Sequence, residues 1–371
     1  MIKVLHIYND LNVAGAQTVI MNYLRYLKGD KEIEMTLLVN NVPQNTAYEQ
    51  ECQQNGYSVL YSGYQPWSGC TVLRPLINWI KCQYYIYREI RRCKPDIIHS
   101  HITSNLPFVT LPALLSGVKV RVHTLHSDPD VFSLPVVVWA RFAFRWLNVY
   151  PICVTQDQAQ KAVKRYGIKQ YSIIRNGIDI RRFANIDRQT IRQELGIAAD
   201  TTVIGCVGRF DKIKNHPFLL HLFAEYLKEN DHAVLMLVGE GPERGNIEKL
   251  TTDFGITDKV LFTGLRNDVE RLYYAMNLFM LTSFHESSSI VTVEAQMAGV
   301  RCVIADSIPA DAVVTNGVNR IPLNAPPSTW IAAMKDELPH DKPQGELEDF
   351  SFKTTIHSLK QTYKTLLKTK K

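Results

Sequence analysis

The most restrictive feature of this chain is the alternation of short, almost unbroken apolar runs with longer helix-like stretches. A strand that is buried on one face alternates apolar and polar residues, whereas a strand buried on both faces is nearly continuous Val, Ile and Leu. Six such runs occupy the first half, at residues 2–8, 34–40, 57–62, 96–101, 118–126 and 150–155, with helix-like segments at 16–28, 74–92 and 105–117. The pattern predicts an α/β fold with a parallel sheet covered on both faces.

The alternation pauses after one more strand and an Asn-Gly turn at residues 171–179, and it restarts near residue 202. Strand candidates in the second half are 202–209, 233–241, 259–264, 277–283 and 300–306, and helix candidates are 216–229, 243–254 and 267–276. A chain of 371 residues is also longer than one ordinary core needs. We therefore predict two Rossmann-like, doubly wound domains, at 1–180 and 181–350, that face a central cleft, and an amphipathic C-terminal helix over 351–371 that crosses back to the first domain.

Charge and cysteine usage narrow the classes of protein further. The net charge is +6, and residues 1–180 hold 19 Lys and Arg against 12 Asp and Glu, whereas residues 181–371 hold 23 against 24. The basic first half favours an anionic surface or acceptor as partner, and nucleic acid is not expected. Seven scattered cysteines without a Cys/His cluster indicate neither a disulfide framework nor a zinc site, which fits a reducing cytoplasm.

The loop NDLNVAGAQT, residues 9–18, joins the first strand to a helix that we expect to begin at about Gln17. Gly15 would let a ligand approach the backbone, and the helix start would offer free N–H groups to a phosphate. A plain strand–helix turn explains the segment equally well. Neither a GxGxxG fingerprint nor a Walker A loop is present.

A second loop, VGRFDKIKNHPFLL at residues 207–220, places two cations at the carboxyl end of a strand. Gly208 ends the strand, and Arg209 and Lys214 follow it before the next helix. A guanidinium and an ammonium at such a position suit a diphosphate. The alternative is a pair of ordinary solvated loop cations.

The stretch FHESSSIVTVEAQMAG, residues 284–299, carries two glutamates. We expect Ser287–Ser289 to cap a helix that runs to Gly299, with Glu286 in the loop before it and Glu294 more than one turn inside. The two carboxylates then serve as separate acceptors for a polyhydroxyl ligand. In the alternative reading, Glu286 only faces the helix dipole and Glu294 is solvated.

Four histidines, at positions 99, 101, 123 and 126, lie at the carboxyl ends of two first-half strands. Their HSH and HxxH spacing on strands gives poor convergence on a single ion, so we predict no metal site. His126 is expected to face the ligand-binding side, and His99 and His123 to lie in the core or to support other residues.

Taken together, these segments resemble the GT-B glycosyltransferases of family 4, a large retaining group that uses nucleotide-sugar donors. The resemblance covers nearly the whole chain and rests on AGAQT, IIRNGID, VGRFDKIKNHPFLL, VGEGPER and TGLRNDVERLYYAMNLFMLTSFHESSSIVTVEAQMAG, which contains the family's E-x7-E segment. Residues 305–330 further look like the transferases of bacterial exopolysaccharide and capsule assembly.

The resemblance implies a role for each matching residue. Glu286, His126, Arg209 and Lys214 would form the catalytic group, with the two cations stabilising the leaving nucleoside diphosphate. Glu286 would bind the donor sugar, Glu294 the ribose, and His126 would lie near the sugar and the β-phosphate. The full donor-binding set would be Gly15, Ala16, Gly208, Arg209, Lys214, Glu286, Ser287, Ser288, Ser289, Ile290 and Glu294. The family needs no metal cofactor and is thought to use front-face attack, so the two glutamates are not a glycosidase pair.

Three positions depart from the family's usual pattern. Ser287 stands where glycine usually follows the first glutamate, and Arg175 stands where proline usually precedes Asn-Gly. The first loop has Ala14, Gly15, Ala16 and Gln17 in place of two glycines and an acid. Because the glutamate and loop positions touch donor or acceptor, the resemblance does not name the sugar.

The resemblance predicts a cytoplasmic hexosyltransferase, peripheral on the inner face of the membrane, that moves a sugar from a UDP-sugar to a polyprenyl-diphosphate-linked saccharide. The basic helix 74–92, with Trp79, Tyr84, Tyr85 and Tyr87, would rest on an anionic membrane with help from residues 131–146. The alternative is a helix packed on the sheet with its aromatic side chains in the core. Other functions open on this architecture are a nucleotide-sugar 2-epimerase and a catalytically silent regulatory subunit.

Overall fold

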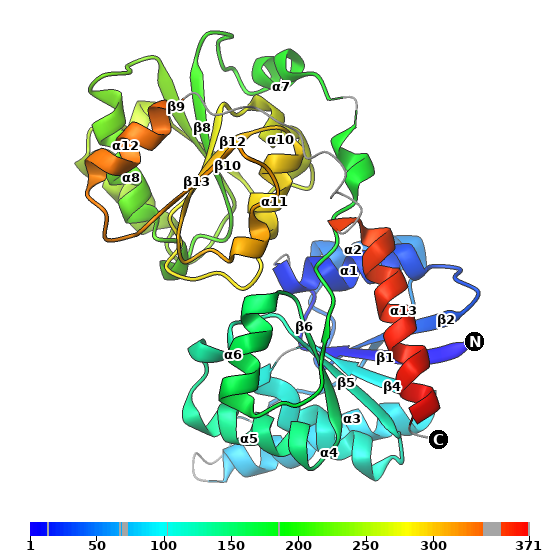
Figure 1. Cartoon of the computed structure of the whole chain (residues 1–371). Coiled ribbons are helices and arrows are strands. Elements are labelled where there is room, and N and C mark those ends of the chain that lie inside the picture. Colours follow the sequence, from blue (N-terminus) through cyan, green and yellow to red (C-terminus); the bar gives the residue numbers. More distant parts are fainter. Residues whose placement is uncertain are drawn as a thin grey trace. The chain divides into compact units, whose positions relative to one another are not determined.

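A computed structural model describes residues 1–12, 15–66, 68, 73–101, 103–184, 186–336 and 350–369. It divides into two compact units: unit 1 comprises Met1–Gly177 and Phe352–Lys371, and unit 2 comprises Ile178–Ser351 (Figure 1). Each unit is an α/β domain built on its own parallel sheet. The six cysteines in the described part of the chain are all free.

The sheet of unit 1 has seven strands in the order β3-β2-β1-β4-β5-β6-β7, and every neighbouring pair is parallel. The strands are β1 (Ile2–Tyr8), β2 (Ile33–Val39), β3 (Val59–Tyr61), β4 (Ile97–Ser100), β5 (Val120–Leu125), β6 (Val149–Cys153) and β7 (Ser172–Ile173). The chain winds outward from β1 in one direction and then from β4 in the other. The switch between these two strands marks the place where ligands bind in open α/β sheets.

The helices of unit 1 cover both faces of this sheet. They are α1 (Gly15–Leu27), α2 (Ala47–Asn55), α3 (Arg74–Cys93), α4 (Leu106–Leu115), α5 (Leu134–Arg145), α6 (Gln156–Tyr166) and α13 (Phe352–Thr369). Helices α3 and α4 bury Ile86 and Val109 against Leu5 and Ile7 of β1. Neighbouring residues of the same strand point the other way, so that His6 meets α1 and α13 on the opposite face.

Helix α13 is held in unit 1 by close packing at its start and by ion pairs along its length. A Cβ on Gly177 would lie 2.6 Å from the Cα of Phe352, so only glycine allows this approach. Lys360 pairs with Asp30, and Lys364 pairs with Glu32 across 2.5 Å. These contacts fix the helix beside the start of β2.

Unit 2 repeats the same winding with six strands in the order β10-β9-β8-β11-β12-β13. The strands are β8 (Thr202–Val207), β9 (Ala233–Val238), β10 (Val260–Gly264), β11 (Leu278–Leu281), β12 (Arg301–Ala305) and β13 (Val318–Ile321). The helices are α7 (Arg188–Glu194), α8 (His216–Leu227), α9 (Arg244–Asp253), α10 (Val269–Ala275), α11 (Ile290–Met297) and α12 (Pro327–Lys335). Its switch point lies between β8 and β11, and its core includes the fully buried Trp330.

Six short 3₁₀ segments complete the described elements. They are η1 (Thr103–Asn105), η2 (Pro129–Val131), η3 (Ile180–Phe183), η4 (Lys212–Lys214), η5 (Thr257–Lys259) and η6 (Ala310–Ala312). The doubly wound fold predicted from the apolar runs is confirmed. The start of α1 differs from the expectation, because the helix begins at Gly15 rather than at about Gln17.

Candidate active site

The predicted donor-binding residues of unit 2 gather at its switch point. Gly208 and Arg209 follow β8, and Glu286 follows β11, the strand paired with β8 in the sheet. A backbone hydrogen bond of 2.8 Å from the Phe284 N–H to the Ile213 carbonyl joins the two loops. The carboxyl ends of these two strands therefore bring together residues that are more than 70 positions apart in the sequence.

Lys214 is held by a tight turn and then by a carboxylate. The Asp211 side chain accepts hydrogen bonds from the Ile213 and Lys214 backbone N–H groups, which orders η4. The Lys214 Nζ lies 2.6 Å from Glu286 Oε1, and both side chains are about 15 % exposed. Ser283 donates a second hydrogen bond of 2.7 Å to the same oxygen.

The electrostatics of this pair keep the lysine charged. Burial lowers the pKa of Lys214, but Glu286, with smaller contributions from Cys206 and Asp211, raises it, and the net shift is upward. An ammonium has three N–H donors and Glu286 uses one of them, which leaves two for a ligand. Arg209 is exposed, and its side chain has no ion-pair or hydrogen-bond partner in the part of the chain that the structure describes.

Glycines allow the backbone of the loop after β9 to approach that of the loop after β8, which carries Lys214. A Cβ on Gly239 would lie 2.0 Å from the carbonyl oxygen of Gly208, and one on Gly241 would lie 2.3 Å from that of Phe210. Gly208 in turn faces the Lys214 side chain, whose Cε lies 2.9 Å from a Cβ placed there. The VGEGPER segment thus supports the loop that carries Arg209 and Lys214.

Helix α11 begins directly after the three serines, as predicted, but the capping hydrogen bond of Ser289 is absent. Ser287 and Ser288 lie in the bend before the helix, and Ser289 precedes Ile290 in a left-handed conformation with φ 42°. Ser289 makes no side-chain cap, because its Oγ lies 2.7 Å from the Thr292 Oγ1 instead. Ser289 thus occupies the predicted N-cap position without making the expected capping hydrogen bond, and a helix start without a side-chain cap suits an anionic ligand group.

Glu294 lies on α11 and has a different hydrogen-bond partner from Glu286. Tyr273 of α10 donates a hydrogen bond of 3.0 Å to its Oε2, and burial raises its pKa to about 7, an effect that the tyrosine reduces. The reading of Glu294 as a solvated carboxylate is wrong. The described hydrogen bonds join Glu286 to Lys214 and Glu294 to Tyr273, so the two glutamates belong to separate groups, as the sequence suggested.

Unit 1 carries the other predicted residues: Gly15, Ala16 and His126. Gly15 and Ala16 form the first turn of α1, and a Cβ on Gly15 would meet nothing within 4 Å. The loop before them is organised by Asp10, whose Oδ1 accepts hydrogen bonds from Asn12 and Gln17. Ala14 lies outside the described residues. Packing within unit 1 therefore does not require glycine at position 15, which leaves a ligand as a reason for it.

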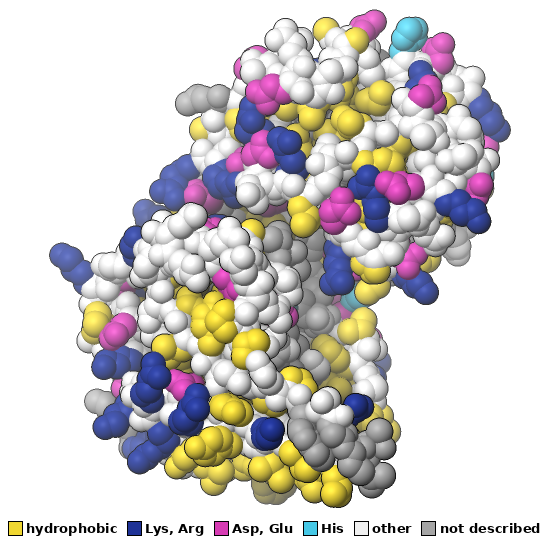
Figure 2. Space-filling model, turned by 180° about the vertical axis from the view of Figure 1, so that it is seen from behind, with side chains coloured by type: hydrophobic (Ala, Val, Ile, Leu, Met, Phe, Trp, Pro, Cys, Tyr) yellow, Lys and Arg dark blue, Asp and Glu magenta, His cyan; other side chains and the backbone are white. Residues whose placement is uncertain are grey.

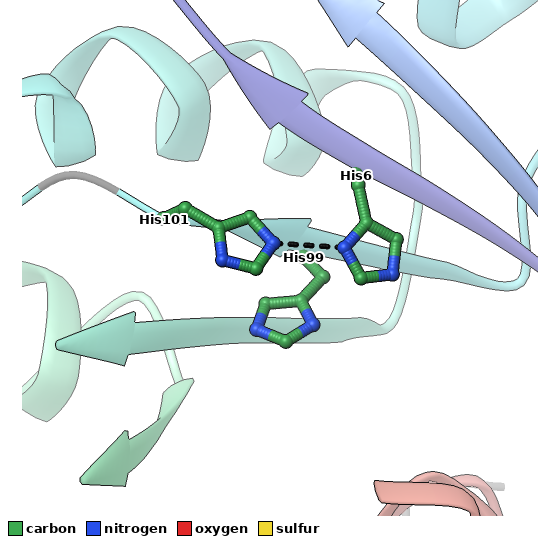
Figure 3. Close-up of side chains that lie close together, drawn as sticks. All are labelled: His6, His99 and His101. Carbon is green, nitrogen blue, oxygen red and sulfur yellow. Dashed lines mark hydrogen bonds between the residues drawn. The ribbon is translucent and has the colours of Figure 1, made fainter. Parts of the chain in front are cut away.

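The histidines of unit 1 lie around its switch point. His6, His99 and His101 are fully buried, and one ring nitrogen from each lies within 4.8 Å of one from each of the others (Figure 3). The Nδ1 of His6 and the Nε2 of His101 are 2.8 Å apart and point at each other, so that they share one proton. This arrangement favours a hydrogen-bonded cluster over a metal centre, in which the lone pairs would point at a common ion.

Sequence reasoning missed four residues that complete these groups. Ser283 and Tyr273 bind the two glutamates, and His6 and Tyr363 join the histidines. Ser283 lies two residues past the end of β11, and this place at a strand end was a usable signal. The other three stand inside apolar strands or helices, where only the tertiary contact distinguishes them from core residues.

Comparison with known proteins identifies the class to which this fold and site belong. Residues 13–182 match the family model "Glycosyltransferase Family 4", and residues 187–344 match "Glycosyl transferases group 1". The chain belongs to this group of glycosyltransferases with the GT-B fold, and it is an enzyme of that class.

Individual relatives agree with this assignment. The chain is 29% identical to "Putative glycosyltransferase EpsF" of Bacillus subtilis (strain 168), over 93% of this chain and 90% of the relative. It is 26% identical to "UDP-Gal:alpha-D-GlcNAc-diphosphoundecaprenol alpha-1,3-galactosyltransferase" of Escherichia coli, over 65% of each. Its fold matches Anabaena Alr3699/HepE in complex with UDP-glucose with a TM-score of 0.81 at 20% identity, covering 98% of this chain and 100% of the other. These relatives favour neither the epimerase nor the silent subunit.

Proposed function

We propose that this glycosyltransferase moves a hexose from a UDP-sugar to a saccharide carried on a polyprenyl diphosphate, with retention of configuration and without a metal cofactor, in exopolysaccharide assembly. Support for the acceptor comes from the Escherichia coli relative, whose name specifies a diphosphoundecaprenol-linked acceptor. Support for the donor comes from the solved structure with UDP-glucose. Support for the pathway comes from the likeness to EpsF.

The observation that carries the proposal is the Lys214–Glu286 pair beside Arg209, whose side chain has no partner among the described residues. When the glycosyl–phosphate bond breaks, negative charge develops on the departing diphosphate. Lys214 has two N–H donors left for it, and Arg209 adds a second cation. These groups would supply the charge stabilisation that a metal ion provides in other transferases.

Each remaining site residue has a role in this proposal. Glu286 is held by Lys214 and Ser283 with its second oxygen left for the hydroxyls of the sugar. Glu294 accepts hydrogen bonds from the ribose, in surroundings where Tyr273 already donates one. His126 contacts the transferred sugar, and Gly15 gives the donor or acceptor close access to the backbone.

A transfer assay tests the proposal directly. The protein is incubated with UDP-sugars and a polyprenyl-diphosphate-linked N-acetylhexosamine, and the product's anomeric configuration is determined by NMR. We expect one UDP-sugar to give a product with the donor's configuration, at a rate that EDTA leaves unchanged. Product with inverted configuration would refute retention, and loss of activity in EDTA would refute the metal-free scheme.

A matched pair of lysine variants assigns the chemistry to the site. Lys214→Met should abolish UDP release, whereas Lys212→Met should leave it unchanged, because Lys212 lies in the same 3₁₀ segment but is exposed and has no ion pair among the described residues. Full activity in Lys214→Met would exclude the diphosphate role.

We also propose that unit 1 docks on an anionic membrane through one face formed by α3, α4 and α5. Leu76, Ile80 and Tyr84 lie four residues apart on α3, and each is at least half exposed. Leu134, Val138, Phe142 and Trp146 form a second exposed row at the same spacing along α5. Helix α4 lies between α3 and α5 and adds the exposed Leu114 and Leu115.

Charge beside these rows favours a membrane as the occupant. Arg141 and Arg145 are exposed on α5, and Lys81 is exposed on α3. Figure 2 shows hydrophobic side chains gathered beside Lys and Arg side chains on unit 1. The sheet-facing side of α3 is formed by Cys82, Ile86 and Ile90, so its aromatic residues do not form the core. Among the described residues, no helix has the length and apolar character needed to span a bilayer.

Vesicle flotation tests the docking face. Trp139 of α5 lies beside Val138 in the sequence and is also exposed. We expect binding to vesicles containing phosphatidylglycerol and not to neutral ones, and a loss of at least tenfold in affinity in Trp139→Ser/Trp146→Ser. Leu265→Ser in unit 2 is the matched control, because Leu265 is also exposed but lies outside this face. Absence of flotation with anionic vesicles would refute the docking proposal and leave the transfer proposal intact.

A further inference from the structure

Six side chains of unit 1 form one continuous hydrogen-bonded chain that ends at His126. His99 of β4 lies 2.7 Å from the Thr124 hydroxyl through Nε2 and 2.6 Å from the Tyr363 hydroxyl through Nδ1. Tyr363 lies 3.3 Å from Nε2 of His6, and Nδ1 of His6 lies 2.8 Å from Nε2 of His101. Nδ1 of His101 lies 3.0 Å from Nε2 of His126.

The imidazoles at the outer end of this chain meet edge to edge. The His6 and His101 ring centroids are 5.0 Å apart with planes 17° apart, and those of His101 and His126 are 5.2 Å and 26° apart. With ring nitrogens only 2.8 and 3.0 Å apart, the rings point at each other nearly in one plane, as linear N–H···N hydrogen bonds require. Figure 3 shows this alignment for His6 and His101.

The hydrogen-bonded chain of six side chains is buried everywhere except at His126. Thr124 is 2 % exposed, and His6, His99, His101 and Tyr363 are 0 % exposed, whereas His126 is partly open to solvent. Burial lowers the pKa of His6 to about 3 and that of His126 to about 4, and it lowers the pKa of His99 and His101 well below the usual value. All four imidazoles are therefore neutral at pH 7, each with one N–H and one lone pair.

Counting the protons fixes the direction of the chain. The Thr124 hydroxyl has a single described hydrogen bond, to His99. If Thr124 donates to His99, then His99 donates to Tyr363, Tyr363 to His6, His6 to His101 through its Nδ1, and His101 to Nε2 of His126. In the opposite direction the buried Thr124 hydroxyl proton would have no acceptor, which costs about 1–3 kcal/mol.

The direction then decides which nitrogen of His126 carries its proton. Because Nε2 of His126 accepts the last hydrogen bond, its proton must be on Nδ1. Reversal would need a proton to enter at the inner end, where Thr124 is buried, while His126 loses one at the outer end. We propose that this chain holds His126 as the neutral Nδ1–H tautomer, so that the one end that reaches solvent is always a hydrogen-bond donor.

The proposal gives a role to residues that the transfer scheme does not use. His6, His101 and Tyr363 are positioning residues that act through His126, and Tyr363 brings α13 into this role. A neutral N–H donor suits an oxygen acceptor, either a sugar hydroxyl or a phosphate oxygen. That ligand role rests on the proposed function, whereas the tautomer does not. His123 stays outside the chain, because its two nitrogens bind Ser100 and Thr103.

NMR of protein labelled with ¹⁵N-histidine measures the tautomer without any ligand. We expect His126, assigned by the loss of its signals in His126→Gln, to show a protonated Nδ1 and an unprotonated Nε2 between pH 6 and 8. Tyr363→Phe removes the hydroxyl that joins His99 to His6, so the shortened chain can run in either direction. The two ¹⁵N shifts of His126 should then move toward each other.

Tyr166→Phe is the matched control, since Tyr166 is a buried tyrosine of the same unit whose hydroxyl has no hydrogen-bond partner among the described residues. It should leave the His126 shifts unchanged. A wild-type His126 that is protonated on Nε2, or on both nitrogens at pH 7, would overturn the proposal, as would unchanged shifts in folded Tyr363→Phe.

Activity separates this inference from the proposed function. We expect Tyr363→Phe to lower kcat about tenfold with KM for the UDP-sugar within about twofold, because an orienting hydrogen bond is lost while the donor-binding cations remain. If the NMR result holds and kcat is unchanged, the hydrogen-bonded chain does fix the tautomer of His126, but a role of that tautomer in transfer is refuted. If no UDP-sugar is turned over, the proposed function fails, and the NMR result still decides whether the hydrogen-bonded chain fixes the tautomer of His126.

Discussion

The two units share one topology and fill its switch point with opposite chemistry. In unit 2, between β8 and β11, the structure places a lysine–glutamate pair and an exposed arginine. In unit 1, between β1 and β4, it places hydrogen-bonded imidazoles that burial keeps neutral. The doubly wound fold therefore decides where a site lies, whereas the side chains at two strand ends decide whether it binds charge or donates a neutral hydrogen bond.

The largest predicted difference between the units is their response to acid. Five histidines of unit 1, at positions 6, 99, 101, 123 and 126, have a pKa lowered by burial, so below pH 6.5 the unfolded state binds protons that the folded state does not. Their stability contribution is complete above pH 6.5 and is lost as pH falls toward 4. Each accounts for up to about 1.4 kcal/mol per pH unit.

Unit 2 should respond far less over the same range. Burial lowers the pKa of His216 to about 4, which destabilises unit 2 in acid, and raises that of Glu294 to about 7, which stabilises it. Between pH 6.5 and 4.5 these two proton effects nearly cancel. Hydrogen exchange measured by mass spectrometry at pH 7.5 and pH 5 should show unit 1 opening first. If unit 2 opens first, the burial of the histidines is contradicted.

A smaller effect follows from removing the charge in unit 2. Lys214→Met leaves the Glu286 carboxylate buried without its partner, which should lower the free energy of unfolding by about 3 kcal/mol. Adding Glu286→Gln should recover most of this loss without restoring activity. Denaturant titration of the single and double variants checks both statements, and equal stability of wild type and Lys214→Met would contradict the pairing.

Glu294 makes the stability of unit 2 depend on pH in the opposite sense, through the binding of about one proton. Its folded pKa of about 7 lies above the unfolded value of 4.5, so its stability contribution is present below pH 4.5 and is lost as pH rises through 7. Glu294→Gln should flatten this dependence by up to about 1.4 kcal/mol per pH unit. Tyr273→Phe is the companion variant, and it should raise the pKa of Glu294 further, because Tyr273 lowers it. Identical pH curves for Glu294→Gln and wild type would refute the raised pKa.

The smallest expected stability effect compares one glycine in each unit. Gly15→Ala should be neutral or stabilising by about 0.5–1 kcal/mol, because the position is helical and open. Gly239→Ala should instead destabilise unit 2, because φ is +139° there and the new Cβ would meet the Gly208 carbonyl. Thermal unfolding measures both. If Gly15→Ala keeps its stability but loses turnover, the glycine serves the ligand; unchanged turnover would remove that role.

The sequence predicted those parts of the molecule that depend on local patterns. Continuous apolar runs identified the buried parallel strands, and loops directly after them identified Gly208, Arg209, Lys214 and Glu286. Polar helices were missed, for example α2, which reads AYEQECQQN and buries only Glu49 and Cys52. Helix α6 was also missed, because its buried residues include small alanines and Gln158 rather than a wide apolar stripe.

The rest of the site depends on contacts between residues distant in the sequence. Tyr363 reaches His6 across 357 positions, and Lys214 reaches Glu286 across 72. No local pattern pairs such residues, and a lone tyrosine in an amphipathic helix has the same appearance as a core residue. The unusual serine after Glu286 was visible from the sequence, whereas the left-handed Ser289 that replaces the expected cap was not.

Calorimetric titration with UDP tests the central claim most directly, namely that the charged switch point of unit 2 binds the diphosphate. Wild type and Lys212→Met should bind UDP with the same affinity, and Lys214→Met should bind it at least about 100-fold more weakly. Uridine, which lacks the diphosphate, should bind all three proteins equally weakly. Equal UDP affinity for wild type and Lys214→Met would contradict the account.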